Sequence, residues 1–221
     1  MPMRILAIET ATDACSVALW RDGQVLERFE PGARRQTERV LPLVEAVLAD
    51  AGIGLGDLDA IAFGRGPGAF TGVRVATSVV QGLAFARDLP VAPVSTLAAC
   101  ALAAFDQHPE RRRVIAAFDA RMGELYLGAY QCRGDEARVL LADGLFDPDQ
   151  VPELAGDDWL LAGSGAVYAK RIGQRVGLAA IDANATPRAG AVARLAVPLV
   201  VQGSTVSAEQ AQPVYLRDKV V

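Results

Sequence analysis

The sequence predicts an α/β protein built from two similar halves, each with a mixed sheet flanked by helices. Three observations carry this prediction. Short strand-like runs alternate with amphipathic helical segments along both halves. The apolar run at residues 4–9, which ends in Glu9, has a counterpart at residues 114–120, where Asp119 follows another apolar run. A polar stretch at residues 106–113 separates the halves, as expected of a linker.

The first half reads as three strands followed by alternating helices and strands. The pair Asp22-Gly23 is a two-residue hairpin signal between the second and third strands. From Thr37 apolar residues recur at helical spacing as far as Ala51, and Gly52 follows as a stop signal. The predicted strands are residues 4–9, 16–21, 24–30, 60–64 and 91–94, and the predicted helices are residues 37–51, 73–87 and 96–105.

The second half opens like the first, with strand-like runs at residues 114–120 and 125–130. Residues 160–165 then predict a strand that enters a glycine turn before a helix. A later helix is expected at residues 192–201, interrupted or started by Pro198. The predicted division of the chain is an N-terminal lobe at residues 1–105, a C-terminal lobe at residues 106–203 and a tail at residues 204–221.

Composition limits the classes of function. The chain has 221 residues, 52% of them apolar, which is enough for a compact core. Lys and Arg total 22 against 26 Asp and Glu, a formal charge of −4, so contact with RNA is expected only through a partner. The widely spaced Cys15, Cys100 and Cys132 suggest neither a disulfide framework nor a zinc site, which fits the reduced cytoplasm. No apolar run has the length of a signal peptide or a membrane span.

The glycine-rich loop after residues 60–64 superficially matches a dinucleotide-binding fingerprint. It reads Gly64-x-Gly66-x-x-Ala69, and Asp88 follows at about the distance of a ribose-binding acid. That fingerprint normally follows the first strand of its fold, whereas three strands and a helix precede this loop, and Pro67 lacks an N–H for phosphate. A tight structural turn explains the glycines but not the Phe-Thr-Gly-Val-Arg run of residues 70–74.

The whole loop resembles, almost residue for residue, the signature loop of the TsaB (YeaZ) family. Residues 5–12, 15–19, 94–97, 119–124 and 213–218 match further motifs of that family, so the resemblance spans the chain. The residues of this signature loop that we take as site residues are Gly64, Arg65, Gly66, Pro67, Gly68, Phe70, Thr71, Gly72 and Arg74.

The resemblance implies the two-lobed, duplicated fold of actin, Hsp70 and sugar kinases, of the ASKHA and ribonuclease H-like type. It also implies a role beside TsaD and the ATPase TsaE in placing a threonylcarbamoyl group on adenosine 37 of tRNAs that read ANN codons. Within that system we expect a non-catalytic scaffold or activator subunit without a cofactor, which meets tRNA only in the complex.

An absence supports the non-catalytic expectation. TsaD carries a His-x-x-x-His pair that holds its metal, and the matching positions here are Thr96 and Cys100. A hydroxyl and a thiol are poor substitutes for two imidazoles, so we predict no metal site and no catalytic residue. The single histidine, His108, lies in the polar stretch and is expected to be solvated.

In the wider superfamily the first hairpin cradles nucleotide phosphate. Thr10, Thr12, Asp13 and Ser16 occupy that place here. They form either a vestigial phosphate site or a turn whose side chains bond local backbone groups. The arginines at residues 34–35 and 111–113 have two interpretations as well, contact with tRNA in the complex or simple solvation.

The helix predicted at residues 73–87 is apolar on two nearly opposite faces. The core face holds Val73, Ala76, Val80, Leu83 and Ala84. The second face, which we predict to bind TsaD, holds Val75, Ser78, Val79, Gly82 and Ala86. Small residues there would admit a partner helix, although packing inside the chain is the alternative. Whether the isolated chain is a monomer or a homodimer stays open.

Two other functions remain as alternatives, a small-molecule kinase of the ASKHA type and a protease-like hydrolase. The first needs ATP turnover by the chain alone and the second needs metal-dependent cleavage. The chain departs from the family pattern at Gln36-Thr37, where relatives commonly carry a histidine before the hydroxyl residue, and at residues 215–221, where it ends soon after the last motif.

Overall fold

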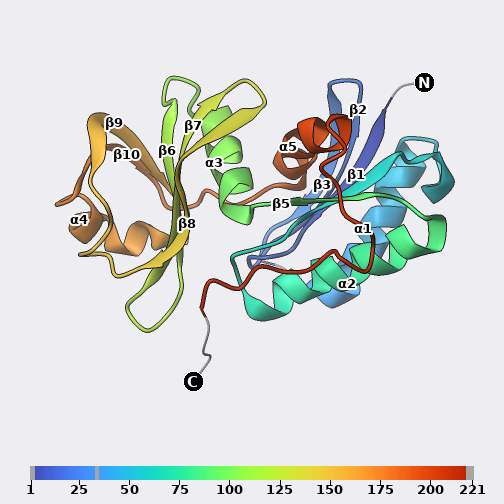
Figure 1. The fold of residues 1–221 in the computed structure, drawn as a ribbon, viewed down its shortest axis with the longest axis horizontal. Coiled ribbons are helices and arrows are strands. Elements are labelled where there is room, and N and C mark those ends of the chain that lie inside the picture. The colour runs from blue at the N-terminus through green and yellow to red at the C-terminus, as the bar shows by residue number, and fades with distance from the viewer. Residues whose placement is uncertain (1–2, 33–34, 218–221) are drawn as a thin grey trace. The chain divides into compact units, whose positions relative to one another are not determined.

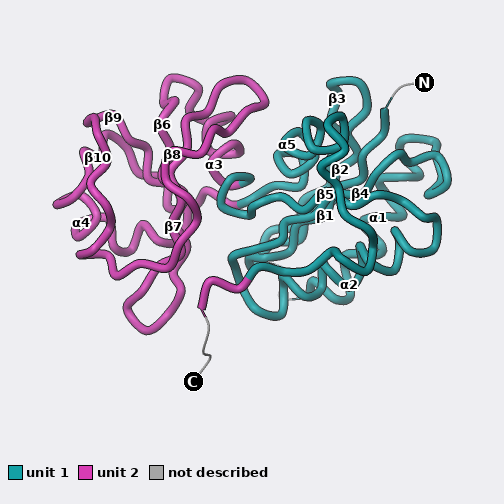
Figure 2. The backbone as a smooth tube through the Cα atoms, viewed as in Figure 1, with its two compact units in different colours: residues 1–99, 187–214 teal, residues 100–186, 215–221 magenta. Residues whose placement is uncertain are grey.

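The computed structural model describes residues 3–32 and 35–217. It divides the chain into two compact units, coloured separately in Figure 2. Unit 1 comprises Met1–Ala99 and Pro187–Val214, and unit 2 comprises Cys100–Thr186 and Tyr215–Val221. The chain therefore passes between the units three times. Arg34 and the end of the predicted tail from Asp218 onward lie outside the described residues.

The sheet of unit 1 has the strand order β3-β2-β1-β4-β5. The antiparallel strands β1 (Arg4–Glu9), β2 (Cys15–Arg21) and β3 (Gln24–Glu30) are followed by β4 (Ala60–Gly64) and β5 (Val91–Val94), which run parallel to β1. The central strands are almost entirely buried, since β4 is buried at all five positions. The predicted bounds of β1, β3, β4 and β5 are confirmed.

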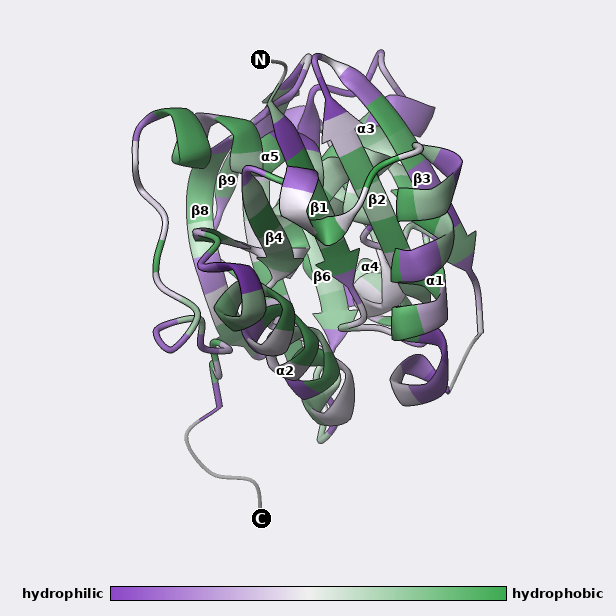
Figure 3. Cartoon of the chain, turned by 90° about the vertical axis from the view of Figure 1, so that its right-hand side faces the viewer, coloured by the Kyte–Doolittle hydropathy of each residue, from purple (hydrophilic) through white to green (hydrophobic). Residues whose placement is uncertain are grey.

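Helices cover both faces of this sheet (Figure 1). The helices α1 (Gln36–Asp50) and α2 (Phe70–Arg87) bury apolar residues in one cluster with β1, β2 and β4. Both carry apolar and polar residues along their length in Figure 3, as helices at a surface do. The opposite face packs against α5 (Ala189–Val201), which contacts β1, β2, β4 and β5.

The position of α5 differs from the predicted division of the chain, which placed residues 187–203 in the C-terminal lobe. Five of its buried residues are small and let the helix approach the sheet: Ala189, Gly190, Ala191, Ala193 and Ala196. Arg188 at its N-terminus pairs with Glu27 of β3 at 3.1 Å. The helix also starts earlier than predicted and continues through Pro198 rather than being interrupted there. The helix therefore belongs to unit 1, because it packs on β1 and β2, although it directly follows unit 2 in the sequence.

Unit 2 repeats the sheet of unit 1 in the order β10-β9-β6-β7-β8. Its central strand β6 (Arg113–Asp119) pairs antiparallel with β7 (Leu125–Arg133) and parallel with β9 (Leu154–Ala162). The outer strands β8 (Glu136–Phe146) and β10 (Val176–Asp182) were not predicted from the sequence. The other elements are α3 (Thr96–Gln107), which carries the chain between the units, a 3-10 helix η2 (Ser164–Tyr168) and α4 (Ala169–Ile172).

The segment after α5 runs back over unit 1. Val206 forms an antiparallel bridge with Val91 at the edge of β5, and Gln81 on α2 donates to the carbonyl of Ala211 at 2.8 Å. At residue 214 the backbone N–H bonds the carbonyl of Arg65, also at 2.8 Å. In residues 3–32 and 35–217 none of the helices combines the length and apolar character that a bilayer crossing requires.

Candidate functional site

The signature loop lies between β4 and α2 and packs directly on the turn that follows β1. A Cβ atom on Gly72 would stand 2.0 Å from the carbonyl oxygen of Thr10, and one on Gly68 would stand 2.4 Å from that of Ala11. Side chains do not fit at these distances, so both glycines are required by close backbone approach. At Gly66 the backbone has a φ of +99° and precedes a cis peptide bond to Pro67.

Hydrogen bonds fix this loop to its surroundings. The N–H of Ala69 donates to the carbonyl of Ala11 at 2.7 Å, and the Thr10 hydroxyl donates to the carbonyl of Gly72 at 2.7 Å. The N–H of Arg65 bonds the carbonyl of Val94, and that of Gly66 bonds the Thr96 hydroxyl at 3.0 Å. These N–H groups are therefore already used, which argues against the dinucleotide-binding alternative because phosphate would need them.

A buried acid lies beneath the loop. Glu9 is 2% exposed and accepts a hydrogen bond from the N–H of Ala11 at 2.6 Å and from the Thr96 hydroxyl at 3.3 Å. Its carboxyl occupies the space over Gly64, where a Cβ would lie 1.7 Å from Oε2. Burial raises the pKa of Glu9 from 4.5 to about 7, although these hydrogen bonds oppose the shift. This carboxyl couples β1, the loop and the start of α3.

The four residues of the first hairpin use their side chains in different ways. Thr10 is committed to Gly72, and the Ser16 hydroxyl donates to Glu27 at 2.6 Å while accepting from the N–H of Ala189 at 3.0 Å. Thr12 accepts weakly from the N–H of Ala14 at 3.4 Å, and Asp13 is exposed. The buried hydroxyls thus bond groups of unit 1 that are distant in sequence, and not the local backbone groups that the structural interpretation of the turn expected.

Gln36, where the sequence was expected to depart from the family pattern, supports the same turn. Its amide donates to the carbonyl of Thr12 at 2.8 Å. Gln36, at the start of α1, therefore stabilises the hairpin through its side chain even though it departs from the family pattern.

The exposed part of the signature loop is its last turn, which forms the start of α2. Phe70 is 48% exposed, Thr71 is exposed, and the guanidinium of Arg74 lies 3.5 Å from the centre of the Phe70 ring. Such a stack of an arginine on an aromatic ring presents a flat, partly apolar surface. The loop therefore combines a locked backbone with an accessible pair of side chains.

The two faces of α2 are only partly as predicted. Val73, Ala76, Val80 and Ala84 are buried, and Leu83 is partly buried against the same core. On the predicted partner face, Val75 and Val79 also pack partly against the core. The exposed members of that face are Ser78, Gly82 and Ala86.

The exposed face of α2 is therefore a stripe that is rotated away from Val75 and Val79. We define the α2 stripe as Phe70, Arg74, Ser78, Gly82, Phe85 and Ala86. Phe85, which is 74% exposed, was missed from the sequence, although its helical spacing from Ser78 and Gly82 was the available signal. A Cβ on Gly82 would have no atom of the described residues within 4 Å, so nothing in that part of the chain requires a glycine there.

The family motif at residues 119–124 lies in unit 2, where it forms a strained turn between β6 and β7. Arg121 and Met122 have positive φ angles of 65° and 55°, and the side chain of Arg217 bonds Glu124 at 2.5 Å. Asp119 accepts from the N–H of Arg121 at 2.9 Å. Tyr168 donates to Asp119 at 3.3 Å, and burial followed by the charge of that aspartate raises the pKa of its hydroxyl.

The arginine clusters and the histidine have acidic neighbours. Arg113 pairs with Asp158 at 3.0 Å, Arg111 lies 3.8 Å from Glu110, and Arg35 lies 3.6 Å from Glu38. His108 lies 3.4 Å from Asp182 in unit 2. In the described part of the chain no group of three or more His, Cys, Asp or Glu side chains is placed to hold a metal ion.

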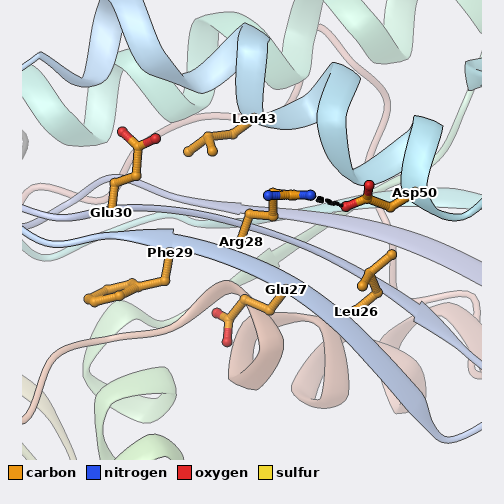
Figure 4. A pocket seen from close by; sticks show the side chains of 7 residues that line it. All are labelled: Leu26, Glu27, Arg28, Phe29, Glu30, Leu43 and Asp50. Atoms are coloured by element: carbon orange, nitrogen blue, oxygen red, sulfur yellow. Dashed lines mark hydrogen bonds and ion pairs between the residues drawn. The ribbon is translucent and has the colours of Figure 1, made fainter.

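A pocket of about 440 Å³ lies along β3, with Leu43 and Asp50 of α1 on one side (Figure 4). Its charged groups are already paired. Arg28 reaches Asp50 at 2.5 Å, Glu30 pairs with Arg39, and Glu27 accepts from Ser16 and Arg188. The pocket therefore lies between β3 and α1, where ion pairs hold these elements together, and we assign no ligand to it.

Comparison with known proteins agrees with the sequence motifs. The family model for TsaD, tRNA N6-adenosine threonylcarbamoyltransferase, matches residues 30–186. The Escherichia coli protein named tRNA threonylcarbamoyladenosine biosynthesis protein TsaB is 42% identical over 225 residues, which cover 99% of this chain and 96% of that protein. The Haemophilus influenzae protein of the same name is 40% identical, with 99% and 95% coverage.

A solved structure gives the same answer for the fold. The structure described as YeaZ from Pseudomonas aeruginosa superposes with a TM-score of 0.89 at 46% sequence identity, covering 97% of this chain and all of that one. The predicted fold class, an α/β protein with two mixed sheets flanked by helices, is confirmed.

Proposed function

Because the chain belongs to the TsaB family, we propose that it is a non-catalytic subunit required with TsaD and TsaE for threonylcarbamoyl modification of tRNA adenosine 37. In this proposal TsaD is the direct partner and performs the transfer. The chain acts as a scaffold or activator, and tRNA meets it only within the complex. The net charge of −4 supports this last point, since phosphate contact by the chain alone would favour a positive balance.

The observation that carries the proposal is the α2 stripe. A glycine in the interior of an exposed helix costs about 0.5–1 kcal/mol relative to alanine. Gly82 faces open space and makes no contact that would explain this cost. A second helix that approaches the stripe closely does explain it, because only small residues allow backbones to come near. Arg74 and Phe70 then supply the arginine and aromatic side chains that are enriched at binding hot spots.

The positions that correspond to the TsaD histidines support a non-catalytic role. Thr96 is fully buried and joins Glu9 to Gly66 through its hydroxyl. Cys100 is also fully buried. Both side chains are therefore part of the protein interior and do not line an accessible reaction site.

Reconstitution tests the proposal. TsaD, TsaE, tRNA and threonylcarbamoyl-adenylate are combined with and without this chain, and modified tRNA is measured over repeated turnovers. We expect product only when the chain is present, and no ATP hydrolysis or tRNA modification by the chain alone. An unchanged yield without the chain would falsify the scaffold assignment.

A set of arginine variants tests the surface. Ser78→Arg places a charge in the centre of the α2 stripe, so binding to TsaD should be lost while the thermal unfolding temperature stays near that of the wild type. Ser204→Arg, at an exposed serine just past α5, is the matched control and should bind normally. Val80→Arg should instead unfold the protein, because Val80 is fully buried. Normal binding by Ser78→Arg would contradict the α2 stripe as the contact surface.

A further inference from the structure

A second pocket, of about 630 Å³, opens at the C-terminal end of α2, at the opposite end of the helix from the signature loop. We call it the α2 end pocket. Its wall on the helix side includes Phe85 and Leu89, and its other wall is the returning segment 205–209. Because Phe85 belongs to the α2 stripe, the pocket continues the exposed surface of the helix. All of its lining residues belong to unit 1.

Two carboxylates mark this pocket, Asp88 and Glu209. Both are exposed, and neither has an ion-pair partner within residues 3–32 and 35–217. The nearby Arg87 does not neutralise them, because its guanidinium packs against Gly56 in the 3-10 helix η1 (Leu55–Asp57). In the pocket along β3, by contrast, the charged side chains are paired with one another or with their neighbours.

Asp88 is an unfavourable residue for its position in two ways. It follows the last turn of α2 with a φ of 51°, a left-handed conformation that glycine or asparagine adopts at lower cost. It also puts a negative charge at the end of the helix where the macrodipole is already negative. The electrostatic penalty is relieved if a cation meets the carboxylate.

We propose that the α2 end pocket receives a lysine or arginine side chain of the protein that covers the α2 stripe. Its aliphatic stem packs on Phe85, Leu89 and Val206, and its charged end meets Asp88 and Glu209. An anionic ligand such as nucleic acid is disfavoured by the same charges. The inference rests on the proposed function, because it takes TsaD as the protein that supplies the cation.

The test compares two substitutions that are the same chemically. Asp88→Asn removes one charge and keeps a side chain that tolerates the left-handed conformation. Asp22→Asn does the same at the hairpin turn between β2 and β3, where φ is 49°, and serves as the control. Affinity for TsaD is measured for both variants and for Asp88→Asn/Glu209→Gln, at low and at high salt, with thermal unfolding to confirm the fold.

We expect Asp88→Asn to weaken TsaD binding about three- to tenfold at low salt, with a larger loss for the double variant and a flatter salt dependence. Asp22→Asn should bind like the wild type. Equal affinities for all variants, with a wild type that does bind TsaD, would overturn the inference and leave the proposed function intact. A wild type without affinity for TsaD would overturn both.

Discussion

Units 1 and 2 share one sheet plan and differ in what is built around it. In each, the first strand is central, pairs antiparallel with the second strand and parallel with a strand that enters a glycine turn. In each unit a glycine packs closely against the first strand or the residue that follows it. Gly72 packs against Thr10 in unit 1, and Gly165 packs against Ala117 in unit 2. Helix α2 follows the turn in unit 1 and has 18 residues, whereas α4 in unit 2 has four.

The comparison separates what the sheet plan requires from what is particular to unit 1. Close glycine contacts occur in both units, so they belong to the packing of the turn on the strand. The buried acid Glu9 and the exposed stripe of a long helix occur only in unit 1 among the residues described, since Asp119 at the matching strand end is half-exposed. We therefore expect a partner to bind at the features that unit 1 has in addition to the shared sheet.

The largest expected effect concerns the two acids at the strand ends. Unfolded, Glu9 titrates near 4.5, and in the folded protein its pKa is about 7. Its contribution to stability is therefore complete below pH 4.5 and is lost as pH rises through 7, a change of about 3 kcal/mol. Glu9→Gln should remove this change, so the free energies of unfolding at pH 5 and pH 8 move closer together by about that amount.

Urea unfolding at several pH values checks this prediction. Asp119→Asn is the matched substitution in unit 2, and it should alter the free energy of unfolding by less than about 1 kcal/mol because the side chain is half-exposed. If Glu9→Gln shows the same pH dependence of stability as the wild type, Glu9 is not the source of that dependence and the contrast between the two acids fails.

The next effect tests what the two units share. Gly72→Ala and Gly165→Ala each force a methyl group into close contact with the first strand, at 2.0 Å from Thr10 O and at 2.6 Å from Ala117 Cβ. Both should lower the free energy of unfolding by about 1–3 kcal/mol. Gly54→Ala, whose methyl would lie 3.7 Å from its nearest neighbour, is the control. A stable Gly72→Ala variant that has lost only TsaD binding would break the parallel between the turns.

The smallest effect concerns the stripe of α2. Gly82→Ala should raise the free energy of unfolding by about 0.5–1 kcal/mol, since the added methyl meets no atom in the part of the chain that the structure describes. It should at the same time weaken binding to TsaD if a helix backbone approaches this position. Chemical denaturation and a binding isotherm measure the two quantities independently. Unchanged affinity would show that the partner does not come close at Gly82.

Local patterns predicted the strands of unit 1 well because these combine apolar runs with clear turn signals. The bounds of β1 and β3 follow directly from the sequence, with Asp22-Gly23 between β2 and β3. The prediction failed for β8 and β10. β10 is rich in alanine and glycine, and β8 does not alternate strictly between apolar and polar residues. Such strands are specified by their neighbours in the sheet rather than by their own residues.

The site was predicted in part. The motif identified the signature loop, but the link from Glu9 through Thr96 to Gly66 joins positions that are far apart in sequence and has no local signal. The exposed face of α2 differs from the face predicted to bind a partner, because helical spacing alone does not reveal that Val75 and Val79 touch the core. Phe85 was missed for the complementary reason, since an aromatic residue in an apolar helix suggests burial.

The return of α5 to unit 1 has a consequence for how the protein matures. Translation proceeds from the N-terminus, so β1 and β2 leave the ribosome long before Ala189–Val201, the helix that covers them. The strands of unit 2 are contiguous in sequence and emerge in full before that helix does. The sheet of unit 1, whose synthesis begins first, is therefore covered by α5 only after the strands of unit 2 have been made, and until then one of its faces is the nascent surface that chaperones meet.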